Sequence, residues 1–137
     1  MLRDGRADVA LLHLPFDSTA GLDAAAEAIA AGGLVLLPTD TVYGVAADAF
    51  DPDAVTRLLA AKNRGRGMPV PVLIGEASTL AGLVLQTPPA ATALAQAFWP
   101  GGLTLVLEHA PSLAWDLGDA EGTVEHGNLL RLLGRYE

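Results

Sequence analysis

The stretch LVLLPTDTVYGVAADAF, residues 34–50, sets two apolar runs on either side of a loop rich in hydroxyl groups. The first run, LVLLP at 34–38, is short, unbroken and aliphatic, which predicts a strand buried on both faces in a sheet covered by helices. The second run, VAADAF at 45–50, predicts another strand. The loop between them, PTDTVYG, is either a polar loop bonded to its own backbone or a ligand pocket at a strand end. The residues alone leave both interpretations open.

Helix signals flank this stretch on both sides. GLDAAAEAIAAGG at 21–33 is composed of strong helix formers and closed by two glycines. DPDAVTRLLAAK at 51–62 predicts a helix with Asp51 as N-cap and Pro52 at its first position. The apolar stripe expected on this second helix consists of Val55, Leu58 and Leu59.

The remaining sequence continues to alternate between helix and strand patterns. VPVLIG at 70–75 predicts an edge or irregular strand because of its prolines, and LTLVLEH at 103–109 predicts a further strand. Residues 78–85 and 88–99 predict two more helices. Because the chain has 137 residues and no linker, repeat or low-complexity tract, we expect a single α/β domain. Its core should be aliphatic, since only 5% of residues are aromatic.

Composition excludes several classes of function. The net charge of −8 argues against a chain that binds nucleic acid over its whole surface, because phosphate binding requires a positive electrostatic potential. The absence of cysteine excludes disulfides, thiolate metal sites and a cysteine nucleophile. The three histidines lack ligand spacing and no serine lies in a G-x-S-x-G elbow, so we expect neither a protein-bound metal nor serine catalysis. With no signal peptide or membrane-length apolar segment, a cytoplasmic protein without membrane contact is expected.

Half of the basic residues gather in one place. Arg57, Lys62, Arg64 and Arg66 lie within ten positions, and the last three belong to the glycine-containing loop KNRGRG. A cluster of this kind can be a solvated surface loop. It can also be an oxyanion site, where cations neutralise phosphate or carboxylate oxygens and glycines admit the ligand. The loop matches neither the Walker A pattern nor G-x-G-x-x-G, so a nucleotide site here would be of another kind.

Three ordered blocks together resemble a known family. They are PTDTVYGVAADA at 38–49, RLLAAKNRGRGMPVPVLI at 57–74 and AFWPGGLTLVLE at 97–108. From about residue 20 to 124 the chain resembles the Sua5/YrdC/YciO family of L-threonylcarbamoyl-AMP synthases. The resemblance implies a YrdC-like (DHBP synthase-like) fold over residues 1–137, an open, twisted mixed sheet with helices that is incomplete at the C-terminus, with 125–137 as a divergent tail. It also implies a nucleotidyltransferase.

The activity implied by the resemblance joins L-threonine, bicarbonate and ATP into threonylcarbamoyl-AMP and releases pyrophosphate. ATP would be a substrate that brings Mg²⁺ with it. The downstream partners implied are the tRNA threonylcarbamoyl-transfer proteins, which modify adenosine 37 of tRNAs, and weak contact with tRNA or double-stranded RNA is part of the same expectation. The family places a large positively charged cavity beside the sheet.

The resemblance also assigns roles to individual residues. Thr41 and Tyr43 of the hydroxyl loop are implied to bind threonine, which would explain why the first strand ends in that loop. Catalytic roles fall on Lys62 and Arg64, the K-x-R of the basic loop. The nucleotide-binding residues implied are Lys62, Arg64, Arg66 and Thr104. We expect Thr41, Lys62 and Arg64 to line one cavity.

The sequence departs from the family pattern in two places. Met68 stands where the family usually has Lys, Arg or Asn, which removes a polar phosphate contact. After Val124 the family continues with an AVR-type run and a Ser-x-Asn motif, whereas this sequence contains no Ser-x-Asn. We therefore expect a C-terminally truncated member with an unpaired sheet edge, low solubility and little synthase activity of its own. In the tail, one apolar helical face is expected from Leu129, Leu130, Leu132 and Leu133. The alternatives are an RNA-binding module or an inactive remnant of the family.

Overall fold

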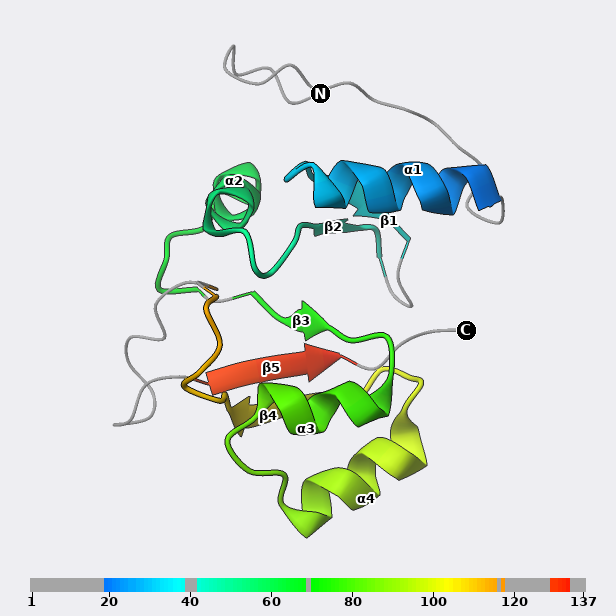
Figure 1. Ribbon diagram of the computed structural model, residues 1–137, viewed down its shortest axis with the longest axis vertical. Coiled ribbons are helices and arrows are strands. Elements are labelled where there is room, and N and C mark those ends of the chain that lie inside the picture. Colours follow the sequence, from blue (N-terminus) through cyan, green and yellow to red (C-terminus); the bar gives the residue numbers. More distant parts are fainter. Residues whose placement is uncertain (1–18, 39–41, 69, 116, 118–128, 134–137) are drawn as a thin grey trace.

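The computed structural model describes residues 19–38, 42–68, 70–115 and 117, together with the backbone of 129–133. Its elements form two groups (Figure 1). The first group contains α1 (Thr19–Ala30), β1 (Val35–Leu37), β2 (Gly44–Ala46) and α2 (Pro52–Ala61). The second contains β3 (Val72–Leu73), a 3-10 turn (Ala77–Thr79), α3 (Leu80–Leu83), α4 (Pro89–Phe98), β4 (Thr104–Glu108) and β5 (Leu129–Leu133). The α/β class is confirmed, with the strands distributed over two small sheets.

The expected end of the first helix is confirmed at the glycine pair. Gly32 has a φ of 75°, in the left-handed region that glycine adopts without steric cost. Its N–H donates to Ile29 O at 2.9 Å and the Gly33 N–H donates to Ala28 O at 2.7 Å. These two bonds form a Schellman motif, which satisfies the last carbonyls of α1 and turns the chain toward β1.

The second helix begins as the sequence predicts. Asp51 is the N-cap, and its Oδ1 accepts from Asp53 N at 2.9 Å and Ala54 N at 3.1 Å. Pro52 occupies the first helical position, where a missing N–H costs nothing. The apolar stripe is buried and consists of Ala54, Val55, Leu58 and Leu59. The buried stripe packs α2 against the β1–β2 sheet, and the cap stabilises the first turn of the helix.

Strands β1 and β2 form an antiparallel pair in which Val35 lies opposite Ala46 and Leu37 opposite Gly44. The expectation that the first strand is buried on both faces is wrong, because Leu36 is 58% exposed. Leu36 lies opposite Val45, on the side of the sheet that faces α2. Val45 and Leu34 pack against the α2 cluster, so α2 covers only part of that face and leaves Leu36 exposed. The second strand is also shorter than predicted and stops at Ala46.

The larger sheet has the order β3-β5-β4, so β3 is an edge strand, as the prolines at positions 69 and 71 predicted. β5 runs parallel to β3 and antiparallel to β4, with Leu132 opposite both Val72 and Leu105. The tail is therefore a central strand, and the expected helix over its leucines is wrong. Pairing on both sides outweighs the weak helical period of LLRLL, since strand preference depends strongly on tertiary context.

Helices α3 and α4 cover one face of this sheet (Figure 1). The predicted helix over residues 78–85 is shortened, because Val84 is already extended and forms a bridge with His109. Leu85 N donates to Glu108 O at 2.9 Å, which draws the chain into the sheet. Sheet pairing thus ends the helix earlier than its sequence pattern does.

The buried hydrophobic residues of the described part are all aliphatic, as the composition predicted. One cluster joins α2 to the β1–β2 sheet and consists of Val55, Leu58, Leu59 and Val70, with Leu34, Val45 and Ala47 against it. The other two clusters lie between the larger sheet and its helices. Leu117 packs against clusters of both kinds, so it connects the two groups.

Candidate functional site

The basic loop begins in the last turn of α2. Lys62 is the C-cap, Asn63 has a φ of 50°, and Arg64 follows. Asn63 N donates to Ala60 O at 3.0 Å and Arg64 N donates to Leu59 O at 2.9 Å. This is a Schellman motif with asparagine in the left-handed position, the commonest substitute for glycine there. The K-x-R spacing therefore sets two cations on either side of one sharp turn.

The charges of this turn differ in their surroundings. Lys62 is partly buried, and this burial is the main cause that holds its pKa below the ordinary value of 10.5. The positive charge of Arg64 lowers the pKa of Lys62 further. Arg64 and Arg66 are exposed. An anion bound at this turn would reverse the second effect by neutralising the neighbouring charge.

The glycines of the basic loop are not required by packing. A Cβ added to Gly65 or Gly67 would meet nothing within 4 Å. Met68, in the family's polar position, is 60% exposed, and its N–H donates to Gly65 O at 3.1 Å. The loop is therefore an open turn in which backbone is accessible beside the cations.

The hydroxyl loop lies between β1 and β2. Thr41, together with Thr39 and Asp40, falls outside the described residues, so the expected cavity shared by Thr41, Lys62 and Arg64 stays a prediction. Tyr43 is described and is 73% exposed, directly before β2. Since β1 and β2 pack on α2, the hydroxyl loop and the basic loop originate from one packed unit.

Thr104 belongs to the other sheet. It is the first residue of β4, is partly buried and lies opposite Leu133 of β5. The turn before it is closed by Trp99, whose Nε1 donates to Leu103 O at 2.7 Å. The structure thus gives Thr104 a defined place at a strand start, while its role in nucleotide binding stays a prediction.

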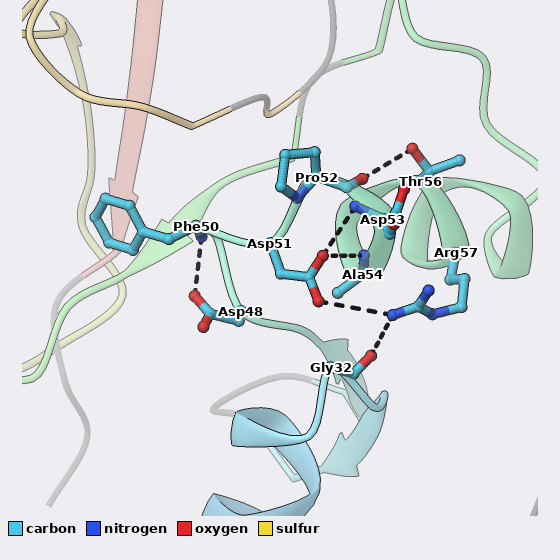
Figure 2. Close-up of polar contacts among 9 residues, drawn as sticks. All are labelled: Gly32, Asp48, Phe50, Asp51, Pro52, Asp53, Ala54, Thr56 and Arg57. Carbon is cyan, nitrogen blue, oxygen red and sulfur yellow. Dashed lines mark hydrogen bonds and ion pairs between the residues drawn. The ribbon is translucent and has the colours of Figure 1, made fainter.

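Sequence reasoning gave no role to two residues that shape this region. Asn63 determines the turn of the basic loop, and an asparagine directly after a helix is the signal that could have identified it. Arg57 was counted among the clustered cations, but its side chain contacts Gly32 and Asp51 at the other end of α2 (Figure 2). A basic residue one turn into a helix gives no sequence signal for such a contact.

The described part of the chain contains no group of three or more His, Asp or Glu side chains that could hold a metal ion. None of the helices in the described ranges is long and apolar enough to cross a membrane.

Comparison with known proteins identifies the family of the chain. The Sua5/YciO/YrdC family model, described as telomere recombination, matches residues 27–124. The chain belongs to this family. A Mycobacterium tuberculosis protein provisionally named threonylcarbamoyl-AMP synthase is 58% identical over 110 residues, which are 80% of this chain and 51% of that protein. The Pyrococcus abyssi threonylcarbamoyl-AMP synthase is 46% identical over 83 residues, covering 61% of this chain and 24% of its own.

Among solved structures, P. abyssi Sua5 complexed with L-threonine matches with a TM-score of 0.67 and 33% identity. The match covers 81% of this chain and 31% of that one. The chain spans about half the length of the mycobacterial relatives and a smaller share of the longer Pyrococcus protein. The fold and the family of the chain are therefore defined.

Proposed function

We propose that this chain performs L-threonylcarbamoyl-AMP synthase chemistry at a low rate, as expected for a sequence without the Ser-x-Asn motif. In this reaction L-threonine, bicarbonate and ATP give threonylcarbamoyl-AMP and pyrophosphate. The observation that carries the proposal is the Lys62–Asn63–Arg64 turn, a pair of cations held by a Schellman motif at the end of α2. The names of the relatives and the threonine complex of P. abyssi Sua5 support the same reading.

The reaction consists mainly of positioning. The amine of threonine adds to CO₂ derived from bicarbonate and loses a proton, which gives a carbamate. A carbamate oxygen attacks the α-phosphorus of ATP, and the bond to the β,γ-diphosphate breaks as pyrophosphate leaves. Such a transfer needs aligned reactants and neutralised charge more than it needs a dedicated acid or base.

The residues divide this work between two loops. Lys62, Arg64 and Arg66 neutralise the triphosphate, together with the Mg²⁺ that arrives with ATP as part of the substrate. Thr41 and Tyr43 hold threonine at the end of β1. Thr104 contributes to the nucleotide side from β4. The lowered pKa of Lys62 fits a cation that is most stable when an anion is bound beside it.

The product would be consumed by a threonylcarbamoyl transferase acting on tRNA, so the function belongs to tRNA modification in the cytoplasm. Direct RNA contact is a weak, secondary property in this proposal. The net charge of −8 disfavours tight RNA binding, and the cations that could meet an RNA are those proposed to meet the nucleotide.

The test is pyrophosphate release by residues 1–137 with threonine, bicarbonate and MgATP, beside a full-length relative. Release that depends on both threonine and bicarbonate supports the proposal. A folded chain that binds neither threonine nor ATP would contradict it and favour an inactive remnant. Retention of double-stranded RNA at physiological salt in a filter assay, without ligand binding, would favour the RNA-binding module.

The first matched pair of variants is Arg64→Glu and Arg64→Lys. The reversal of charge should weaken ATP binding by at least about tenfold and leave threonine binding within about threefold, because the guanidinium is assigned to the triphosphate. The lysine variant keeps the charge and should retain most of the ATP affinity. Titration calorimetry of each ligand separately measures both. Equal loss for the two ligands would remove Arg64 from the nucleotide site.

A further inference from the structure

The ends of α1 and α2 meet at Gly32 in a junction formed by Gly32, Asp51 and Arg57 (Figure 2). The Arg57 Nη2 donates to Gly32 O at 2.5 Å and lies 3.8 Å from Asp51 Oδ2. The other carboxylate oxygen of Asp51 caps α2. The Asp51 carboxylate therefore caps α2 and also pairs with Arg57. Arg57 in turn donates to the carbonyl of Gly32, which follows α1.

The backbone at this junction leaves no room for a side chain. A Cβ on Gly32 would lie 2.7 Å from Asp51 Oδ2 and 3.2 Å from Arg57 Nη2. The φ of 75° independently disfavours any residue but glycine. Gly32 thus combines a left-handed backbone, close contact with Asp51 and Arg57, and a carbonyl that accepts a charged hydrogen bond. These contacts hold the C-terminal end of α1 next to the N-terminal end of α2.

The two chain segments held there lead to the two candidate binding loops. Gly32 lies three residues before β1, whose far end opens into the hydroxyl loop. Arg57 lies on α2, five residues before Lys62. The segment from Gly32 through β1 and the segment along α2 are each short and regular, so we expect a displacement at the junction to shift the end of β1 and the Lys62–Arg64 turn.

We propose that Arg57 is a positioning residue that fixes the β1–β2 pair, from which the hydroxyl loop extends, relative to the basic loop. The inference rests on the proposed function, since the reaction requires the carbamate oxygen and the α-phosphorus to meet in line. Binding of threonine requires only the hydroxyl loop, and binding of ATP requires only the basic loop. Only the transfer step needs the two loops at the correct separation, and a misplacement of about 1 Å can cost on the order of 100-fold in rate.

The experiment compares Arg57→Gln and Arg57→Lys with Thr56→Ala in residues 1–137. Thr56 is the neighbouring exposed residue, and its hydroxyl donates to Pro52 O within the same helix at 2.9 Å, which makes it a matched control. The measurements are the dissociation constants of threonine and ATP separately, the single-turnover rate of pyrophosphate release and the melting temperature.

For Arg57→Gln we expect a rate loss on the order of 100-fold with both dissociation constants within about threefold. The melting temperature should fall by no more than about 5 °C, because the Arg57 side chain is 51% exposed. Arg57→Lys should recover part of the rate, since its ammonium can donate to Gly32 O. Thr56→Ala should match the original chain. An unchanged rate in Arg57→Gln, or a parallel loss of both affinities and rate, would overturn the inference.

A chain that binds neither ligand would refute the proposed function and leave the junction testable by hydrogen exchange. In Arg57→Gln, the amides of 35–37 and of 62–64 should then both exchange about tenfold faster than in Thr56→Ala. Exchange that changes at neither segment, or only within α2, would show that Arg57 couples nothing beyond its own helix.

Discussion

At the scale of single residues, the site depends on backbone positions as much as on charges. Asn63 has left-handed backbone and separates Lys62 from Arg64, so both cations owe their placement to its φ of 50°. The sequence predicted the charges of this loop and their spacing. It could not predict the burial of Lys62, because burial depends on which elements pack around the end of α2.

The conformation of Asn63 can be tested by substitution. Asn63→Gly should keep or slightly raise stability, because glycine adopts left-handed backbone freely. Asn63→Val should lower the free energy of unfolding by about 1–2 kcal/mol, since a β-branched residue is strained there. Urea unfolding measures both variants. Equal stability of the two would mean that this turn does not use the left-handed conformation.

The pKa of Lys62 gives a second prediction. Arg64→Gln should raise it part of the way toward 10.5, because burial, the larger cause, remains. In the folded chain the pKa of Lys62 lies below 10.5, the value taken for the unfolded chain. At low pH the partly buried ammonium of Lys62 therefore lowers the stability of the folded state. This penalty is lost as the pH rises from the folded-state pKa to 10.5, because the folded chain releases its proton first. The free energy of unfolding of the original chain should therefore increase with pH across that interval. An NMR titration of the lysine side chain, with denaturation at each pH, checks both statements.

At the scale of elements, the sequence was most reliable where signals were local. The cap at Asp51, the proline at position 52 and the glycine pair at 32–33 each set a helix boundary through neighbouring backbone groups, and all were confirmed. The errors arose where distant pairing decided the outcome. Residues 129–133 became a strand and Leu36 became exposed because of partners, or the lack of them, that no local pattern contains.

The N-cap of α2 offers a prediction at this scale. Asp51→Ala removes the acceptor for two backbone N–H groups and should lower the free energy of unfolding by about 1–2 kcal/mol. Asp51→Asn keeps a capping oxygen and loses only the charge facing Arg57, so it should cost less than about 1 kcal/mol. Thermal unfolding of the two variants separates cap from ion pair. An equal loss in both would assign the effect to charge.

At the scale of the whole molecule, the larger sheet has one face that the described residues cover and one face that they leave open. Leu105 points toward α4 and is 7% exposed, whereas Val106 on the same strand is 48% exposed and Leu73 on β3 is 54% exposed. Adjacent strand residues face opposite sides, so the open face carries apolar side chains. The sequence pattern could not predict that this face is open, because apolar residues at successive strand positions would also suit a sheet covered on both faces.

This open face should limit solubility. The double variant Leu73→Lys with Val106→Lys should raise the concentration at which the chain stays monodisperse, because charges on an exposed sheet oppose association. Light scattering across a concentration series measures the effect. Leu105→Ser, on the covered face of β4, is the control and should lower the free energy of unfolding by about 2–5 kcal/mol without improving solubility. No gain from the lysine variant would mean that association occurs elsewhere.

The strand order β3-β5-β4 has a consequence for how the protein is made. Neither β3 nor β4 pairs with the other, and both use β5, whose residues are translated more than twenty positions after β4 ends. The group of α1, β1, β2 and α2 needs no later segment for its own pairing, so it can form on the ribosome. The second group must wait with two unpaired strands and their apolar side chains available to other chains. Synthesis rate and chaperone supply should therefore affect the yield of this sheet more than that of the first group.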